Sequence, residues 1–258
     1  MTCSAAVMGI FLALIVSFHL RFFPLTAAVM FWVAGFDVIY VLQDIEHDTT
    51  TVQTSLKRLG PVEISMITGR GDTDDLFHCL MDRYHYLGCH GHVGEHIKYM
   101  VFDCNQRPLA CLLFGSSAWK TAARDRFIGW DGPSRQANLK LTTNNTRFLI
   151  LPWVRVKNLA SLILSACVRR LRHDWYQRYG HDLCLVESFV DRSRFAGTCY
   201  KAANWLHVGD TYGSGKQGKG YCYHGTPKEI YLYVLEPKFR FIIGCQQKAP
   251  CLFHCPPP

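Results

Sequence analysis

Two acidic residues stand four positions apart in a strand-like segment, Glu187 and Asp191, and Tyr200 follows in the next segment. Because alternate residues of a β-strand share a face, both carboxylates are expected to point the same way. Two carboxylates beside a phenol can act as a general acid and base, or they can hold Mg²⁺. The structural alternative is that Asp191 caps the next turn while Glu187 pairs with a basic neighbour such as Arg147.

His85 is a further candidate for acid–base chemistry, since it stands between Tyr84 and Tyr86 at the expected end of a helix. Among the side chains, imidazole has the ordinary pKa that lies nearest to neutrality, which suits it to act as a base. A hydrogen-bonded structural histidine is the alternative interpretation.

Basic residues alternate with aromatic residues in two stretches of the chain, and a glycine-rich basic loop at 212–220 follows them. Cations neutralise phosphates and aromatic rings stack on bases, so this pattern predicts contact with nucleic acid. The alternative for residues 169–178 is the solvated face of an amphipathic helix. The candidate nucleic-acid residues are Arg124, Arg126, Arg147, Arg192, Arg194, Lys216 and Lys219.

The composition excludes a wholly disordered chain, because 49% of the 258 residues are hydrophobic and 13% are aromatic. Lys and Arg number 28 against 20 Asp and Glu, and the net charge of +8 favours anionic partners such as nucleic acid, a phosphorylated cofactor or a lipid surface. The 12 cysteines include no Cys-x-x-Cys spacing, which favours buried free thiols and a cytoplasmic protein.

Composition also divides the chain. Residues 1–43 form an apolar segment, residues 44–73 are expected to be a linker, residues 74–243 have the texture of one compact domain, and residues 244–258 form a tail rich in Cys and Pro. The apolar segment contains two apolar stretches, and each is near the roughly 18 to 20 residues that span a bilayer. It could be a membrane anchor, a buried appendage or a stretch outside the folded unit. A membrane is therefore an expected partner only if residues 5–42 are a genuine anchor.

The hydrophobic pattern of the compact domain predicts an α/β (α+β) fold, with a central mixed β-sheet and flanking helices. A strand at 148–151, a long helix from Asn158 to Gly180 and a strand at 183–190 form a βαβ unit, which is expected to be parallel and right-handed. The other expected elements are a helix at 74–86, a hairpin at 99–114, a short helix at 195–205 and a strand at 230–235.

Several motifs in these elements fit a single pattern. They include Arg83-Tyr84-His85-Tyr86-Leu87-Gly88, Asn144-Asn145-Thr146-Arg147-Phe148-Leu149-Ile150-Leu151-Pro152, Glu187-Ser188-Phe189-Val190-Asp191 and Ala203-Asn204-Trp205. Over residues 75–240 the chain resembles the DruA family, which is named after a component of the Druantia anti-phage defence system. The resemblance implies a bacterial or archaeal cytoplasmic protein of anti-phage defence or mobile-element biology, with transposase-associated relatives. Other defence-system proteins are then plausible partners, but no reaction is implied.

The order of the elements also resembles a GNAT-type acetyltransferase, in which the turn before the long helix binds the pyrophosphate of acetyl-CoA at a helix N-terminus. The corresponding residues here are Arg155, Lys157, Asn158 and Ala160, and Asn158 replaces the usual glycine. Three functions stay open: a DruA-type defence component that contacts nucleic acid, a divergent acyltransferase that uses acetyl-CoA, and a non-catalytic binding or scaffold subunit.

Overall fold

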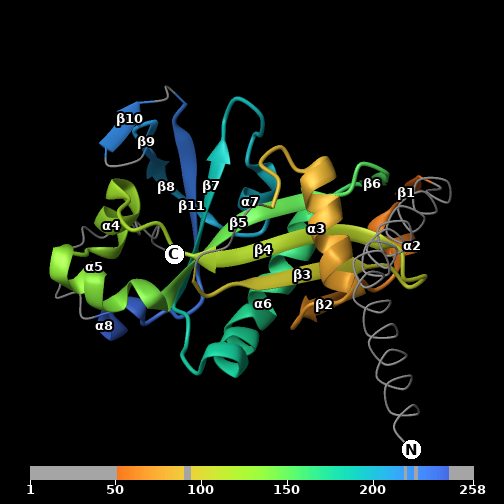
Figure 1. Ribbon diagram of the computed structural model, residues 1–258, viewed down its shortest axis with the longest axis horizontal. Helices are drawn as coiled ribbons and strands as arrows, with labels where there is room; N and C mark the ends of the chain where they lie inside the picture. Colours follow the sequence, from red (N-terminus) through yellow and green to blue (C-terminus); the bar gives the residue numbers. More distant parts are fainter. Residues whose placement is uncertain (1–50, 90–93, 218–219, 224–225, 244–258) are drawn as a thin grey trace, which may run out of the picture. The chain divides into compact units, whose positions relative to one another are not determined.

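The computed structural model describes residues 51–89, 94–217, 220–223 and 226–243 (Figure 1). The apolar segment 1–43 and the tail 244–258 lie outside these residues. Among the helices that are described, none is both long enough and apolar enough to cross a bilayer.

A seven-stranded mixed sheet is the centre of the fold, with strand order β2-β3-β4-β5-β7-β11-β8. All neighbours are antiparallel except β5 and β7, which are parallel. The predicted α/β fold with a central mixed sheet is therefore confirmed. The strands are β2 (Glu63–Ile67), β3 (Ile97–Phe102), β4 (Pro108–Ser116), β5 (Thr142–Ile150), β7 (Leu185–Asp191), β8 (Leu206–Asp210) and β11 (Lys228–Val234).

Two short pairs of strands lie outside this sheet: β1 (Val52–Thr54) pairs with β6 (Val154–Val156), and β9 (Ser214–Gln217) pairs with β10 (Gly220–Tyr223). The expected linker at 44–73 is thus structured from Val52 onward, because it contributes β1, the helix α2 (Leu56–Leu59) and the edge strand β2. This part belongs to the domain, whose compact unit begins at Val52.

The long helix α6 (Leu159–Tyr179) connects β5 to β7 and confirms the predicted βαβ unit. Its buried positions include Leu159, Ile163, Cys167 and Leu171, spaced four apart, which places one apolar stripe against the sheet. Gly180 ends the helix in the left-handed conformation, with φ of 73°.

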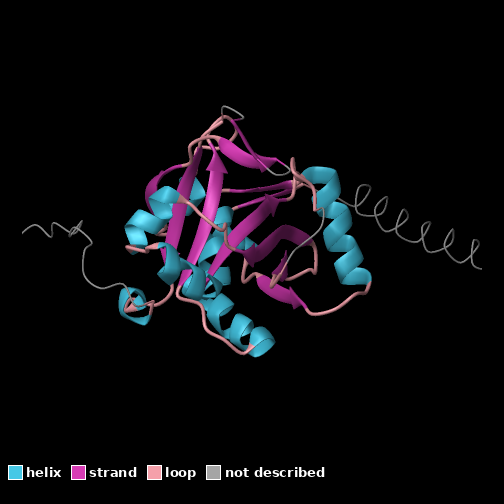
Figure 2. Cartoon of the chain, turned by 60° about the vertical axis from the view of Figure 1, so that its left-hand side comes forward, coloured by secondary structure: helices cyan, strands magenta, loops and turns pink. Residues whose placement is uncertain are grey.

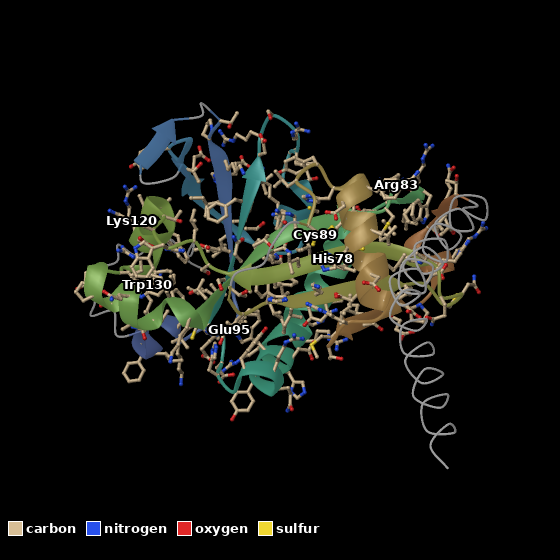
Figure 3. The ribbon with its side chains drawn as sticks, in the orientation of Figure 1. His78, Arg83, Cys89, Glu95, Lys120 and Trp130 are labelled. Atoms are coloured by element: carbon tan, nitrogen blue, oxygen red, sulfur yellow. The ribbon has the colours of Figure 1, made fainter. Side chains whose placement is uncertain are left out.

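Helices α3 (Asp72–Tyr84) and α6 cover opposite faces of the sheet. Neighbouring residues of β3 demonstrate this, since successive side chains of a strand point to opposite faces. Lys98 donates from Nζ to Asp74 of α3 at 2.6 Å and lies 2.8 Å from the ring of His78, which is labelled in Figure 3. The hydroxyl of Tyr99 donates instead to Asp174 of α6 at 2.6 Å.

Short helices also flank the sheet (Figure 2). The helix expected at 195–205 is observed only as α7 (Thr198–Ala202), because Gly197 adopts a left-handed conformation with φ of 65° just before it. Helices α4 (Ala122–Ile128) and α5 (Gly132–Asn138) had no counterpart in the sequence prediction, and neither did the short helix α2. The chain also forms the 3-10 turn η1 (Leu139–Leu141) and α8 (Phe239–Ile242).

Candidate functional site

Strands β5 and β7 separate and leave a pocket between them. Their backbones pair only at the start of both strands, where Thr142–Asn144 of β5 lies beside Leu185–Glu187 of β7. Beyond this point a pocket of about 380 Å³ lies between their carboxyl-terminal halves, and the segment before α7 and the segment after α3 close it. In α/β sheets such a gap at the carboxyl end of neighbouring parallel strands is a common ligand position.

A hydrogen-bonded network of three polar side chains forms one wall of this pocket. The hydroxyl of Tyr200 donates to Asn145 Oδ1 at 2.8 Å, and Ser188 Oγ donates to the Tyr200 oxygen at 3.0 Å. The Tyr200 ring stacks on Tyr231, with centroids 5.5 Å apart. Burial raises the pKa of Tyr200 well above the usual value of a phenol, so the side chain keeps its proton at neutral pH.

His85 also lines the pocket, and its geometry makes it a hydrogen-bond donor. Burial, assisted by the nearby Arg147 guanidinium, lowers the pKa of His85 to about 4. The ring is therefore neutral at pH 7. The backbone N–H of Leu87 donates to Nδ1 at 3.2 Å, which leaves the proton on Nε2. This arrangement favours a structural or donor role for His85 over that of a base.

The structure does not bring Glu187 and Asp191 together. Glu187 is fully buried and does not line the pocket, and its two oxygens accept from Arg124 at 2.9 Å and from the Ala118 N–H at 2.7 Å. Burial raises the pKa of Glu187, and the Arg124 guanidinium acts in the opposite direction. Glu187 thus follows the structural alternative, with Arg124 as its partner in place of Arg147.

Asp191 lines the pocket and also caps the turn after β7, as its structural alternative predicted. Its Oδ1 accepts from the backbone N–H and the hydroxyl of Ser193, at 2.9 and 2.7 Å, and these bonds lower its pKa. With the Glu187 oxygens occupied, this pair does not fit Mg²⁺, which needs several carboxylate or water oxygens around one point. Within the described residues, no cluster of three potential metal ligands is found.

The structure contradicts the expectation that Arg124 contacts nucleic acid. The side chain is fully buried, and it donates to Glu187, to Asp125 at 2.8 Å and to the Ala118 carbonyl at 2.7 Å. Trp130, labelled in Figure 3, is buried as well, with its ring centroid 5.7 Å from the Arg124 guanidinium. Arg124 therefore stabilises the fold and has no access to a phosphate.

The other expected nucleic-acid residues divide between the surface and the pocket. Arg126 is exposed on α4. Arg147 lines the pocket and donates to the carbonyls of Gly88 and Thr146, both at 2.8 Å. Arg192 is paired with Glu229 at 2.9 Å.

Arg194 is exposed beside the pocket, and its guanidinium lies 4.8 Å above the ring centroid of Tyr86. Lys219 and the side chain of Lys216, the remaining expected nucleic-acid residues, lie outside the described part of the chain.

The expected phosphate-binding residues lie at the start of α6 and not in the pocket lining. Arg155, in β6, and Lys157 have exposed side chains, and Ala160 is half-buried in the first turn of α6. Asn158 is exposed and left-handed, with φ of 65°. It therefore adopts the backbone conformation for which glycine is usually selected.

Sequence reasoning overlooked Asn145 and Ser188 in the network and Tyr86 and Phe195 at the mouth of the pocket. One signal was present, since Asn is rare in strands and two consecutive asparagines, Asn144 and Asn145, stand inside β5. No pattern in the sequence indicated that the segments around residues 86 and 195 would meet.

The fold and this pocket define a mixed α/β protein with a candidate ligand site where β5 and β7, the parallel neighbours of its seven-stranded sheet, separate. The family model of Druantia protein DruA matches residues 41–219, which is more than half of the chain. The chain belongs to the DruA family, and the resemblance inferred from its motifs is confirmed.

Solved structures of N-acetyltransferases are similar to this chain. Spermidine/spermine N-acetyltransferase SpeG from Vibrio cholerae has 10% identity and a TM-score of 0.43, over 69% of this chain and 94% of that chain. A structure described as a putative phosphinothricin N-acetyltransferase has 13% identity and a TM-score of 0.42, over 68% and 99%. Similarity at this level does not bear on substrate or reaction. No curated protein matches the chain.

Proposed function

We propose that this DruA-family protein acts in anti-phage defence as an acyltransferase, and that the pocket between β5 and β7 receives the acyl group of an acyl-CoA. The observation that carries the proposal is the separation of the parallel pair. Three residues of each strand are paired, and the strands then diverge around about 380 Å³. A GNAT-like order of elements implies that the acyl donor enters at this place.

The start of α6 fits the pyrophosphate of such a donor. The first N–H groups of a helix have no partner within the helix and attract anions. Asn158 supplies the left-handed turn, with φ of 65°, and its side chain is exposed. Arg155 and Lys157 add two exposed cations to the same turn. These residues would hold the phosphates, while the acyl end would lie in the pocket.

Tyr200 is the residue suited to proton transfer in this reaction. A bound acyl-CoA would supply a thioester, whose sulfur needs a proton when the acyl group moves to a nucleophile. Tyr200 lines the pocket, and its hydroxyl carries a proton at neutral pH. Ser188 donates to the Tyr200 oxygen at 3.0 Å, and a hydrogen bond to this oxygen stabilises the phenolate that proton transfer would leave.

Calorimetric titration of acetyl-CoA tests this function directly. The wild-type protein should bind, and the Arg155→Ala, Lys157→Ala double variant should bind about tenfold more weakly, because two phosphate contacts are lost. Arg169→Ala is the control, since Arg169 is exposed on the outer side of α6. Absence of binding, or equal affinity in all three proteins, would contradict the proposal and leave the non-catalytic scaffold as the better account.

A further inference from the structure

The mouth of the pocket carries two exposed aromatic side chains next to each other. Tyr86 is 40% exposed and Phe195 is 52% exposed, and their ring centroids are 5.7 Å apart. The guanidinium of Arg194 lies over the Tyr86 ring. These residues come from the segments after α3 and after β7, so the fold assembles them. Exposed rings at a pocket mouth, with a cation stacked on one of them, suit a flat π-system as ligand.

The charges around these rings favour an anion. Arg147 and Lys228 line the pocket, and Asp191 is the single carboxylate among the lining residues. Arg194 adds a further exposed positive charge beside Tyr86. Because like charges repel at short range, this surface disfavours a polycation and attracts a phosphate-bearing molecule.

We propose that Tyr86, Phe195 and Arg194 form a stacking platform for a base of single-stranded nucleic acid. The neighbouring phosphates would contact Arg194 and Lys228. A single strand is required because a stacking platform needs a free base face. The inference deepens the proposed function by naming the class of molecule that would present the nucleophile, but stacking itself does not depend on acyl transfer.

Fluorescence anisotropy with a short labelled single-stranded oligonucleotide, without acetyl-CoA, tests the platform. Tyr86→Ala and Phe195→Ala should each weaken binding about tenfold or more, and Tyr86→Trp should restore it. Arg194→Ala should weaken binding and lower the salt dependence by about one phosphate contact. The matched controls are Tyr176→Ala and Arg169→Ala, both exposed on α6, and these variants should bind like wild type.

Three outcomes would overturn the platform: no binding of the oligonucleotide, equal affinity of wild type and Tyr86→Ala, or an equal loss in Tyr176→Ala. The platform would also be overturned if a polyamine displaced the oligonucleotide by binding in the pocket itself. The outcome is separable from acyl transfer. If the oligonucleotide binds through the platform while acetyl-CoA does not bind, the platform stands and the proposed acyltransferase fails. If acetyl-CoA binds while the oligonucleotide does not bind through the platform, the proposed acyltransferase stands and the platform fails.

Discussion

Arg124 is a cation with no access to solvent, and its environment consists of compensating charges. Its guanidinium lies 2.9 Å from Glu187 and 2.8 Å from Asp125, and Asp125 is shared with Arg135 at 3.2 Å. Transfer of an ion out of water costs several kcal/mol, so each member of this network depends on the others. The network attaches α4 to β7 through Glu187. Ser188, which follows Glu187 in β7, belongs to the pocket wall.

Removal of one partner should therefore lower the free energy of unfolding far more than removal of a surface charge on the same helix. Arg124→Ala should lower the free energy of unfolding by about 3 to 5 kcal/mol, because it leaves Glu187 buried and unpaired. Arg126→Ala, on the exposed side of α4, should change it by about 0.5 kcal/mol or less. Urea unfolding measures both values. Similar stabilities for the two variants would show that the buried pair is not formed.

His85 should make the stability of the protein depend on pH. Its folded pKa of about 4 lies below the ordinary value of 6.5, so the unfolded chain takes up the proton first as the pH falls. Stability should therefore decrease between pH 6.5 and 4, by roughly 1 to 2 kcal/mol after allowance for the partial exposure of the ring. Urea unfolding of wild type and His85→Asn at pH 7 and 5 measures this contribution. Identical pH dependence in both proteins would refute it.

At the scale of elements, the turn into α6 determines how a phosphate could approach. Asn158 holds the left-handed conformation that a glycine would adopt without strain, but it retains a side chain at the helix N-terminus. Asn204 is also left-handed, with φ of 62°, and it lies after α7. Substitution of either asparagine by glycine therefore removes a side chain from a left-handed residue, at two different places in the fold.

Asn158→Gly should increase the affinity for acetyl-CoA several-fold, because the backbone becomes accessible to the pyrophosphate. Asn204→Gly should leave the affinity unchanged, and both variants should differ in stability from wild type by less than about 1 kcal/mol. Calorimetric titration and urea unfolding give the two quantities. Equal acetyl-CoA affinity in the two variants would indicate that the start of α6 does not contact the donor.

At the scale of the whole molecule, the parts of the fold with strong local patterns could be predicted from the sequence. The apolar stripe of α6 has its start signal at Asn158 and its stop signal at Gly180, and the β3–β4 hairpin has long apolar strands. Helix α4 was overlooked because its buried Arg124 has the sequence pattern of a surface residue. Its burial follows from the ion pair with Glu187, 63 positions away, together with the bonds to Asp125 and to the Ala118 carbonyl.

The candidate site was predictable only in part, for the same reason. His85, Asp191 and Tyr200 do line one pocket. His85 follows the end of α3, Asp191 ends β7, and Tyr200 lies in α7 beside the separated strands. Glu187 does not, since its partners Arg124 and Ala118 hold it in the interior. The platform residues Tyr86 and Phe195 meet across more than a hundred positions, and tertiary packing alone determines that contact.

Hydrogen–deuterium exchange with and without acetyl-CoA tests most directly whether the separated strands form the donor site. Saturating acetyl-CoA should slow exchange in the carboxyl-terminal halves of β5 and β7 and in the first turn of α6, and it should leave α5 unchanged. Binding without protection of β5 and β7, or protection confined to other surfaces, would contradict the account.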